Sequence, residues 1–319
     1  MKGGTIMTRW KNMNHKRTMT CLKDIDSASQ TSQSLLYEVC TQSPYDDARR
    51  AAIGSLKNPS LLVRVARSET DQEICKAAIE KLADDSSLLQ VAEHIFDDRY
   101  FCFLAINRIN DQQMLYRIAQ QHAYGECRVA AIKRLDDQGF LLKIAQQNSD
   151  PEARKAAIVG LKNQNELALI ALRDASSWVR RAAIAKLTDS ELVADVALRN
   201  NMSCIRHCAL LRLKELAPSE GFSAHIVTPL LGLMSNSTTV TAVIELAQQA
   251  DVDWISQSTD ATVQALFESF NEARGWRVCN PLDSAIKRLY KARTDLQDSF
   301  DALTWTNPYT NCSIVFSQE

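Results

Sequence analysis

A chain of 319 residues with 45% hydrophobic content can bury a large core, and its formal net charge of −1 excludes an overall attraction to nucleic acid or to an anionic membrane. No apolar run approaches the roughly 18 residues of a membrane-spanning helix, and the N-terminus lacks a signal-peptide core, so we expect no membrane association. Nine cysteines, an odd number, favour free thiols in a reducing compartment, and we expect a cytoplasmic protein.

The first 33 residues are predicted to form a basic leader. Residues 1–20 contain five Lys or Arg residues and no acidic residue, and Trp10 is their only large aromatic side chain. A disordered terminus accounts for this composition, and an arm that binds nucleic acid or a membrane surface is the alternative. Residues 34–40, SLLYEVC, match the second helix of the repeat that follows and are expected to form an N-terminal half-repeat.

Residues 45–216 contain an internal repeat of about 26 residues. The phrase RRAAIAKL at 180–187 has a close copy, RKAAIVGL, at 154–161, and its Ile recurs at steps of 26 or 27 residues. The aligned positions are Ile53, Ile79, Ile106, Ile132, Ile158, Ile184 and Leu210. A second register carries Ala66, Ala92, Ala119, Ala145, Ala171 and Ala197. Two registers that repeat together indicate an array of structural units.

Each repeat is predicted to form two short helices. The first carries the AAI phrase, the second carries the pattern L-x-x-[VI]-A, and both place apolar residues at i, i+3 and i+4. Five residues after the Ile comes an Asn or Asp, whose side chain can cap the second helix. These residues are Asn58, Asp84, Asp111, Asp137, Asn163 and Asp189. Because one such pair cannot bury its own apolar stripes, neighbouring repeats must stack.

Two of these phrases carry a resemblance to a known family. DPEARKAAIVGL (150–161) and SSWVRRAAIAKL (176–187) are similar to the short-repeat members of the HEAT-like, armadillo-type α-solenoids, including the leucine-rich repeat variant. The resemblance covers just over half of the chain and implies a curved superhelix that binds other macromolecules. The leucine-rich repeat variant also implies an iron–sulfur cluster held by clustered N-terminal cysteines. This chain has only Cys21 and Cys40 there, so we expect no cofactor.

The expected fold is therefore all-α, a right-handed α-solenoid of about seven two-helix repeats of 26 residues over residues 34–216. After Leu216 the period fades through APSEGFS, and residues 217–319 are expected to form a less regular helical region. Helices are predicted near 238–249, near 261–274, and from a cap at Asn280 to about residue 303. This region is either a degenerate continuation of the repeats or a small domain packed on them, and residues 304–319 are not assigned.

No catalytic or metal-binding pattern is apparent in the sequence. It contains no phosphate-binding glycine loop, no HExxH and no CxxC, and no Cys/His or Ser/His/Asp grouping is evident. The best metal candidates are Cys204, His207 and Cys208 in CIRHC. Cys208 fills a small core slot whereas His207 falls at an outward position, so we expect no metal there. We accordingly predict that the protein is not an enzyme.

A series of basic residues stands four positions before the aligned Ile and is interrupted by Cys75 and Cys102. The series consists of Arg49, Arg128, Arg154, Arg180 and Arg206. We expect these arginines, here called the arginine ladder, to pair with acidic residues of the neighbouring repeat, and contact with a ligand is the alternative.

The second helices carry the predicted binding surface. Positions −2 and +1 relative to the small residue should face outward, on the side that is concave in solenoids of this kind. The residues there that we predict to contact a partner are Arg64, Arg67, Arg117, Lys143, Leu169, Leu172 and Leu198. We predict a non-enzymatic scaffold for protein or peptide partners. The alternative is a nucleic-acid-binding solenoid whose Arg and Lys residues contact phosphates, and the oligomeric state stays open.

Two apolar groups interrupt otherwise polar surfaces. Leu169, Leu172 and Leu198 would form an exposed patch unless an external partner, or residues 217–319 folded back, covers them. On the first helices, Phe103 and Val129 replace charged residues three positions before the Ile, close to the single 27-residue step. We predict a local kink there, with repacking of a distorted repeat as the favoured interpretation and a secondary contact surface as the alternative.

Overall fold

The computed structural model describes residues 14–25, 29–68, 71–94, 99–216, 224–272, 276–293 and 295. Every regular element in these ranges is helical, which confirms the all-α prediction. None of the described helices combines the length and the apolar character that a membrane span requires. The chain divides into two compact units, an N-terminal unit of residues 1–160 and a C-terminal unit of residues 161–319.

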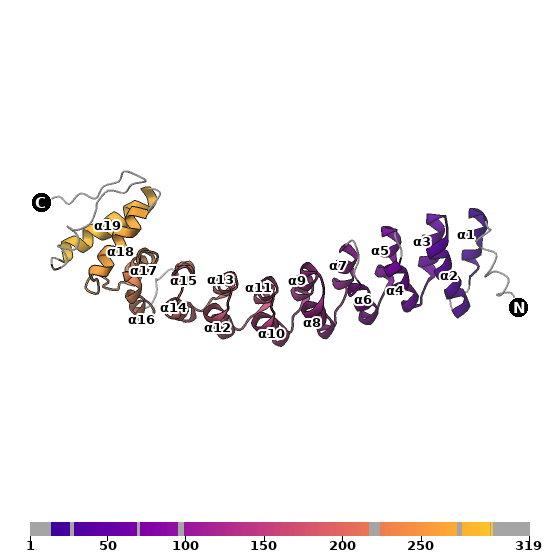
Figure 1. Cartoon of the computed structure of the whole chain (residues 1–319), viewed down its shortest axis with the longest axis horizontal. Coiled ribbons are helices and arrows are strands. Elements are labelled where there is room, and N and C mark those ends of the chain that lie inside the picture. Colours follow the sequence, from indigo (N-terminus) through magenta and orange to yellow (C-terminus); the bar gives the residue numbers. More distant parts are fainter. Residues whose placement is uncertain are drawn as a thin grey trace. The chain divides into compact units, whose positions relative to one another are not determined.

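The helices of the N-terminal unit form two layers. They are α1 (His15–Lys23), α2 (Gln30–Gln42), α3 (Asp46–Ser55), α4 (Pro59–Ser68), α5 (Gln72–Lys81), α6 (Asp85–Ala92), α7 (Tyr100–Ile106), α8 (Gln112–Gln121), α9 (Gly125–Arg134), α10 (Gln138–Gln147) and α11 (Pro151–Gly160). The first helices of the repeats, α3, α5, α7, α9 and α11, pack on one another in chain order. The second helices α4, α6, α8 and α10 do the same, and α2 precedes them, so the unit is a stack of helix pairs (Figure 1).

The most extensively packed pair is offset by one helix from the sequence repeat. Each second helix contacts mainly the first helix of the next repeat, as α4 contacts α5 and α10 contacts α11. The division between the two units, after Gly160, falls between two such pairs although it cuts the fifth sequence repeat.

The aligned apolar positions form the core of each unit. The exposed fraction of the aligned Ile residues and of Leu210 is at most 2%, and the Ala residues of the second register are fully buried. Small side chains in this second register allow neighbouring helices to approach closely, and the larger aligned residues fill the space between the layers. Both registers are therefore core positions, as predicted.

The Asn and Asp residues between the two helices are caps. Asp137 Oδ1 accepts a hydrogen bond from the Phe140 amide at 2.9 Å, and Asn58 Oδ1 accepts one from the Ser60 amide at 3.0 Å. The same contact is made by Asp84, Asp111, Asn163 and Asp189. Each cap satisfies amide groups that have no partner inside the helix, so the second helix begins at the same place in every repeat.

Two members of the arginine ladder pair with acids of the next repeat, as predicted. Arg49 lies 2.7 Å from an Asp71 carboxylate oxygen, and Arg128 lies 2.8 Å from one of Asp150. Arg128 and Arg154 also donate to backbone carbonyls at the end of the preceding second helix, to that of His122 in the case of Arg128. These ladder arginines therefore link successive repeats, and this contact gives them a structural role.

Replacing Asp150 with Asn should reduce the free energy of unfolding by about 1 kcal/mol at neutral pH. The hydrogen bond from Arg128 holds the pKa of Asp150 below its ordinary value of 3.8. A carboxyl group whose pKa is lowered by folding stabilises the protein above its unfolded-state pKa, and this contribution disappears as the pH falls through the folded-state pKa. Urea unfolding of both proteins from about pH 7 to about pH 3 should show the difference shrinking as the pH falls.

The matched control is Glu152→Gln, because Glu152 pairs with Lys155 at 3.7 Å on the exposed surface and should contribute less than about 0.5 kcal/mol. A stability difference for Asp150→Asn that is the same at every pH would contradict the ionic origin of the effect.

The N-terminal end differs from the expected leader over part of its length. Helix α1 lies inside residues 1–33, packs on α3, and buries Thr18 and Leu22. Asn14 caps it by accepting from the Arg17 amide at 3.1 Å. The predicted half-repeat, α2, is thus preceded by a further helix. Composition alone indicated a leader because only two of the nine side chains of α1 are buried. Residues 1–13, with Trp10, lie outside the described residues.

The C-terminal unit continues the helix pairs and then becomes irregular. Its elements are α12 (Gln164–Arg173), α13 (Ser177–Lys186), α14 (Ser190–Arg199), α15 (Ser203–Glu215), α16 (Ala224–Val227), the 3-10 helix η2 (Thr228–Ser235), α17 (Val240–Gln249), α18 (Asp260–Glu272) and α19 (Trp276–Ala292). Helix α16 and η2 pack on α14, and α17 packs on α15. The described part of this region therefore extends the stack from its end.

Helix α19 differs from its predicted bounds at both ends. It begins at Trp276, so Asn280 and Pro281 lie inside the helix and Asn280 is not its cap. A proline removes only one backbone hydrogen bond, and burial of Leu282, Ile286 and Leu289 along the same helix outweighs that loss. The helix ends at Ala292 rather than near 303, and residues 296–319 lie outside the described part of the chain.

Candidate partner-binding surfaces

The predicted cationic residues of the N-terminal unit lie on the layer of second helices. Arg64 and Arg67 on α4, Arg117 on α8 and Lys143 on α10 are all exposed, as their positions in the repeat predicted. The i+3 and i+4 spacing that buries the Leu and Ala residues of these helices turns positions −2 and +1 outward.

Aromatic side chains accompany two of these cations, a feature that the sequence did not predict. The Arg64 guanidinium lies over the Tyr37 ring, 4.5 Å from its centroid. The Lys143 ammonium lies 6.0 Å from the centroid of Phe140, whose ring stacks on Tyr116 at 4.5 Å. We call the surface made by Tyr37, Arg64, Tyr116, Phe140 and Lys143 the cation–aromatic surface. The available signal was that Tyr37 and Tyr116 both stand three positions before the small residue of the second register.

Arg117 has an acidic partner, Glu93. Its Nε lies 2.8 Å from a Glu93 carboxylate oxygen, and both side chains are partly exposed. The carboxylate offsets the charge of Arg117 and repels phosphate, so this part of the surface has a weaker attraction for nucleic acid than its arginine suggests.

The predicted leucines lie on the second helices of the C-terminal unit. Leu169 on α12 and Leu198 on α14 are 39% and 37% exposed, and Leu172 is half-buried. Helices α12 and α14 pack on each other, so the three side chains belong to one apolar surface, here called the leucine surface. The exposure of Leu169 and Leu198 shows that none of the described C-terminal helices covers them.

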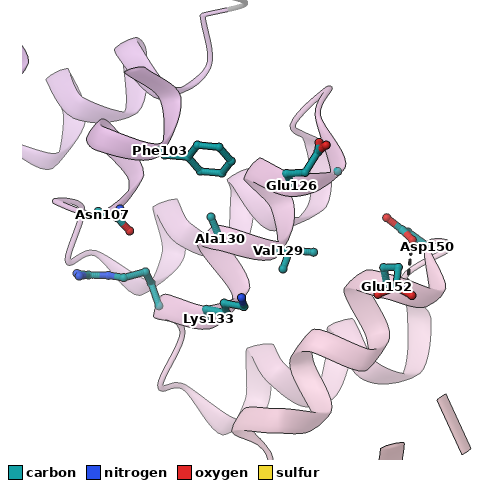
Figure 2. Close-up of a pocket in the computed structure, with 10 residues that line it drawn as sticks. Phe103, Asn107, Glu126, Val129, Ala130, Lys133, Asp150 and Glu152 are labelled. Carbon is teal, nitrogen blue, oxygen red and sulfur yellow. Dashed lines mark hydrogen bonds between the residues drawn. The ribbon is translucent and has the colours of Figure 1, made fainter. Parts of the chain in front are cut away.

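A hollow of about 690 Å³ lies on the opposite layer of the N-terminal unit, between α7, α9 and the start of α11. Figure 2 shows Phe103 of α7 and Val129 of α9 directed towards it, with Glu126, Asp150 and Glu152 along one side. Phe103 is half-buried, and its predicted role in a secondary contact surface therefore stays open.

The acidic groups of this hollow already have partners. Glu126 pairs with Arg99, Asp150 pairs with Arg128, and Glu152 pairs with Lys155. The hollow therefore combines an apolar floor with acidic side chains that are already paired with cations.

The structure groups one set of potential metal ligands that the sequence did not reveal. Cys102, His122 and Cys127 are buried, and one ligand atom from each lies within 4.8 Å of the others. Hydrogen bonding with Cys102 raises the pKa of the His122 imidazole, and a hydrogen bond between Cys127 and Cys102, together with burial, raises the pKa of the Cys127 thiol. The interruption of the arginine ladder at Cys102 was the only signal in the sequence.

The cysteines that the sequence favoured, those of CIRHC, lie in a different environment. Cys204 is exposed, Cys208 is half-buried, and Arg181 Nε donates to Cys208 Sγ at 3.2 Å. His207 is also half-buried. These three side chains do not form a buried cluster of the kind seen around Cys102.

The described elements define an all-α helical-repeat protein. No protein-family model, no curated protein and no solved structure matches this chain. The resemblance of its repeat phrases to the HEAT-like, armadillo-type families stays a prediction, as does the right-handed superhelix that it implies.

Proposed function

We propose that this protein is a non-enzymatic helical-repeat scaffold that binds protein or peptide partners through its second helices. The leucine surface carries the proposal. Leu169 and Leu198 are more than one-third exposed at positions where earlier repeats place Arg, Lys, Gln or Glu. Soluble proteins seldom leave adjacent apolar side chains uncovered without a binding role, and buried aliphatic anchors supply much of the energy of protein interfaces.

The cation–aromatic surface supports the same function. Arg and Tyr are enriched in protein interfaces because each combines a large contact area with directed polar groups. A cation held over a ring is also ordered before a partner arrives, which lowers the entropic cost of binding. Such a surface suits a peptide that carries carboxylate groups next to apolar side chains.

The nucleic-acid alternative receives less support. Phosphate binding would need several unpaired cations along one surface, and Glu93 places a carboxylate beside Arg117. The free thiols of the described cysteines fit the cytoplasmic location that we propose for the protein.

The double substitution Leu169→Ser with Leu198→Ser should weaken partner binding at least about tenfold, because two apolar anchors are lost. The partner is captured on the immobilised full-length chain from nuclease-treated lysate, identified by crosslinking at the leucine surface, and titrated in purified form. Leu211→Ser is the matched control. Leu211 is 42% exposed in the same unit but lies on α15, a first helix, so its substitution should leave binding unchanged.

Nuclease and salt distinguish the two functions. Binding to protein through leucines should survive nuclease treatment and change little between low and moderate salt. Capture that disappears with nuclease, falls steeply with salt and is unaffected by the double substitution would overturn the proposal and indicate phosphate binding.

A further inference from the structure

We propose that Cys102, His122 and Cys127 form a binding site for a zinc ion in the N-terminal unit. Two thiolates and an imidazole are a common ligand set for zinc, with Zn–S distances of about 2.3 Å and Zn–N distances of about 2.0–2.1 Å. Tetrahedral geometry then places ligand atoms roughly 3.5–3.8 Å apart. The three ligand atoms lie within 4.8 Å of one another, so a small inward movement brings them to one ion.

The repeat itself brings the three side chains together. Cys102 occupies the slot of the arginine ladder on α7, and Cys127 occupies an inner slot of α9 that is alanine in the next repeat, Ala153. His122 follows α8 at the position that is Asn148 one repeat later. Because stacking places these slots next to one another in every repeat, one unusual residue in each of the three slots is enough to assemble the cluster.

We infer from the equivalent slots which imidazole nitrogen faces Cys102. In the sixth repeat, Arg180 of the ladder donates to Asn200 Oδ1 at 3.4 Å, and this oxygen also accepts from the amide two residues later. His122 Nδ1 makes the equivalent contact with the amide two residues later, that of Tyr124, at 3.1 Å. Cys102 precedes His122 by twenty residues, as Arg180 precedes Asn200. The Cys102 thiol therefore belongs on the Nδ1 side of the ring.

The other imidazole nitrogen is held in the manner that zinc sites use. His122 Nε2 lies 2.7 Å from the Ala92 carbonyl oxygen and donates to it, because Nδ1 is the atom that accepts from Tyr124. A hydrogen bond from one ring nitrogen to a carbonyl fixes the tautomer and leaves the lone pair of the other nitrogen available to a metal. Zinc binding would exchange the 3.1 Å contact with the Tyr124 amide for a coordinate bond to Nδ1.

A hollow borders one of the three proposed ligands, His122. This hollow of about 340 Å³ is lined by Glu93, Arg117 and His122 together with their neighbours on α8. An ion entering through this hollow would pass the Glu93 carboxylate and reach His122 first. Three protein ligands leave one position of a tetrahedral ion open, which a water molecule would fill.

At this repeat the bound ion would provide the link between neighbouring repeats that the arginine ladder provides at Arg49 and Arg128. At both positions a guanidinium joins the first helix of one repeat to the loop before the next, whereas the thiol of Cys102 is too short to do so. Zinc would bridge Cys102 on α7 to Cys127 on α9 and to His122 between α8 and α9. Binding would convert both thiols to thiolates and release two protons, so the exchange is balanced without a redox step.

Cobalt(II) reports on such a site because tetrahedral thiolate coordination produces intense visible absorption and a thiolate-to-cobalt charge-transfer band. The full-length chain, kept reduced, is titrated with cobalt and then with zinc. We expect one cobalt ion per chain with both spectral features, displacement of the cobalt by zinc, and a higher Tm in the presence of zinc.

Two variants use residues that the next repeat already carries in the same slots, so they should fold. His122→Asn and Cys127→Ala should each lower cobalt affinity by more than about tenfold and remove the zinc-dependent rise in Tm. Two controls should retain both signals. Cys75→Ala changes the ladder slot one repeat earlier, and Cys204→Ser with Cys208→Ser removes the thiols of CIRHC.

The cobalt spectra of the wild-type and variant chains decide whether Cys102, His122 and Cys127 bind the ion. A wild-type chain without the cobalt spectrum, or one whose spectrum is unchanged by His122→Asn and Cys127→Ala, overturns the proposal. Loss of the spectrum only in the Cys204→Ser and Cys208→Ser protein also overturns it, because the ion would then be bound by CIRHC. The readouts require no partner, so failure here leaves the proposed scaffold function untouched.

Discussion

Deletion of residues 177–189, which removes α13 and the loop after it, should abolish cooperative folding of the C-terminal unit. Helix α13 packs between α12 and α15, so its loss exposes the apolar faces of both and joins one second helix directly to another. Nearest-neighbour contacts supply most of the stability of stacked repeats, and this deletion breaks them at a single place. Urea unfolding followed by circular dichroism should lose its sigmoidal transition for this unit.

Deletion of residues 177–202 removes twice as many residues but should do less damage. It takes out one whole 26-residue repeat, α13 with α14, and joins Ser176 to Ser203. Ser177, which normally follows Ser176, and Ser203 are both the first residue of a first helix, so the junction preserves the register of the stack. The shortened protein should unfold cooperatively, with a smaller m-value because less surface is exposed on unfolding. Equal loss of folding in the two deletions would contradict the repeat architecture.

Replacing Ile132 with Ala should lower the free energy of unfolding of the N-terminal unit by about 2–5 kcal/mol. Ile132 lies on α9, which packs between α7 and α11, and is 1% exposed. Truncation removes buried methyl groups and leaves a cavity that the packed helices around it can fill only in part. Equilibrium urea unfolding with an unchanged m-value measures the loss directly.

Val159→Ala is the control for this substitution. Val159 stands next to the aligned Ile158 on α11 but is 65% exposed, so its truncation should change stability by less than about 0.5 kcal/mol. A loss for Ile132→Ala no larger than that for Val159→Ala would show that the aligned Ile is not a core position.

Local periodicity explains why the repeat architecture could be predicted. A helix that buries one face needs apolar residues at i, i+3 and i+4, and this requirement is written into every repeat whatever its neighbours are. The caps behave in the same way, because Asp137 contacts an amide only three residues away. Arg49 and Arg128 each pair with an Asp that lies 22 residues later in the chain, as expected for basic residues of stacked repeats.

The candidate sites depended on contacts between repeats and were therefore predicted less completely. The outward positions of Arg64 and Leu169 follow from helical geometry, and the structure places both on the surface. The ring of Tyr37 beneath Arg64 lies on a different helix, twenty-seven residues earlier in the chain. Which side chains meet across two helices depends on rotamers and on the offset of the stack, and the period specifies neither.

The sequence by itself determined the helical repeat, its length, its caps and the face that each helix buries, because these rest on interactions within a few turns of chain. Only the tertiary structure decided three things: the addition of α1 to the N-terminal stack, the internal position of Pro281 in α19, and the meeting of Cys102, His122 and Cys127. In each case, packing between elements distant in sequence outweighed the local signal. Proximity in a stacked array follows from the slot that a residue occupies, not from its distance along the chain.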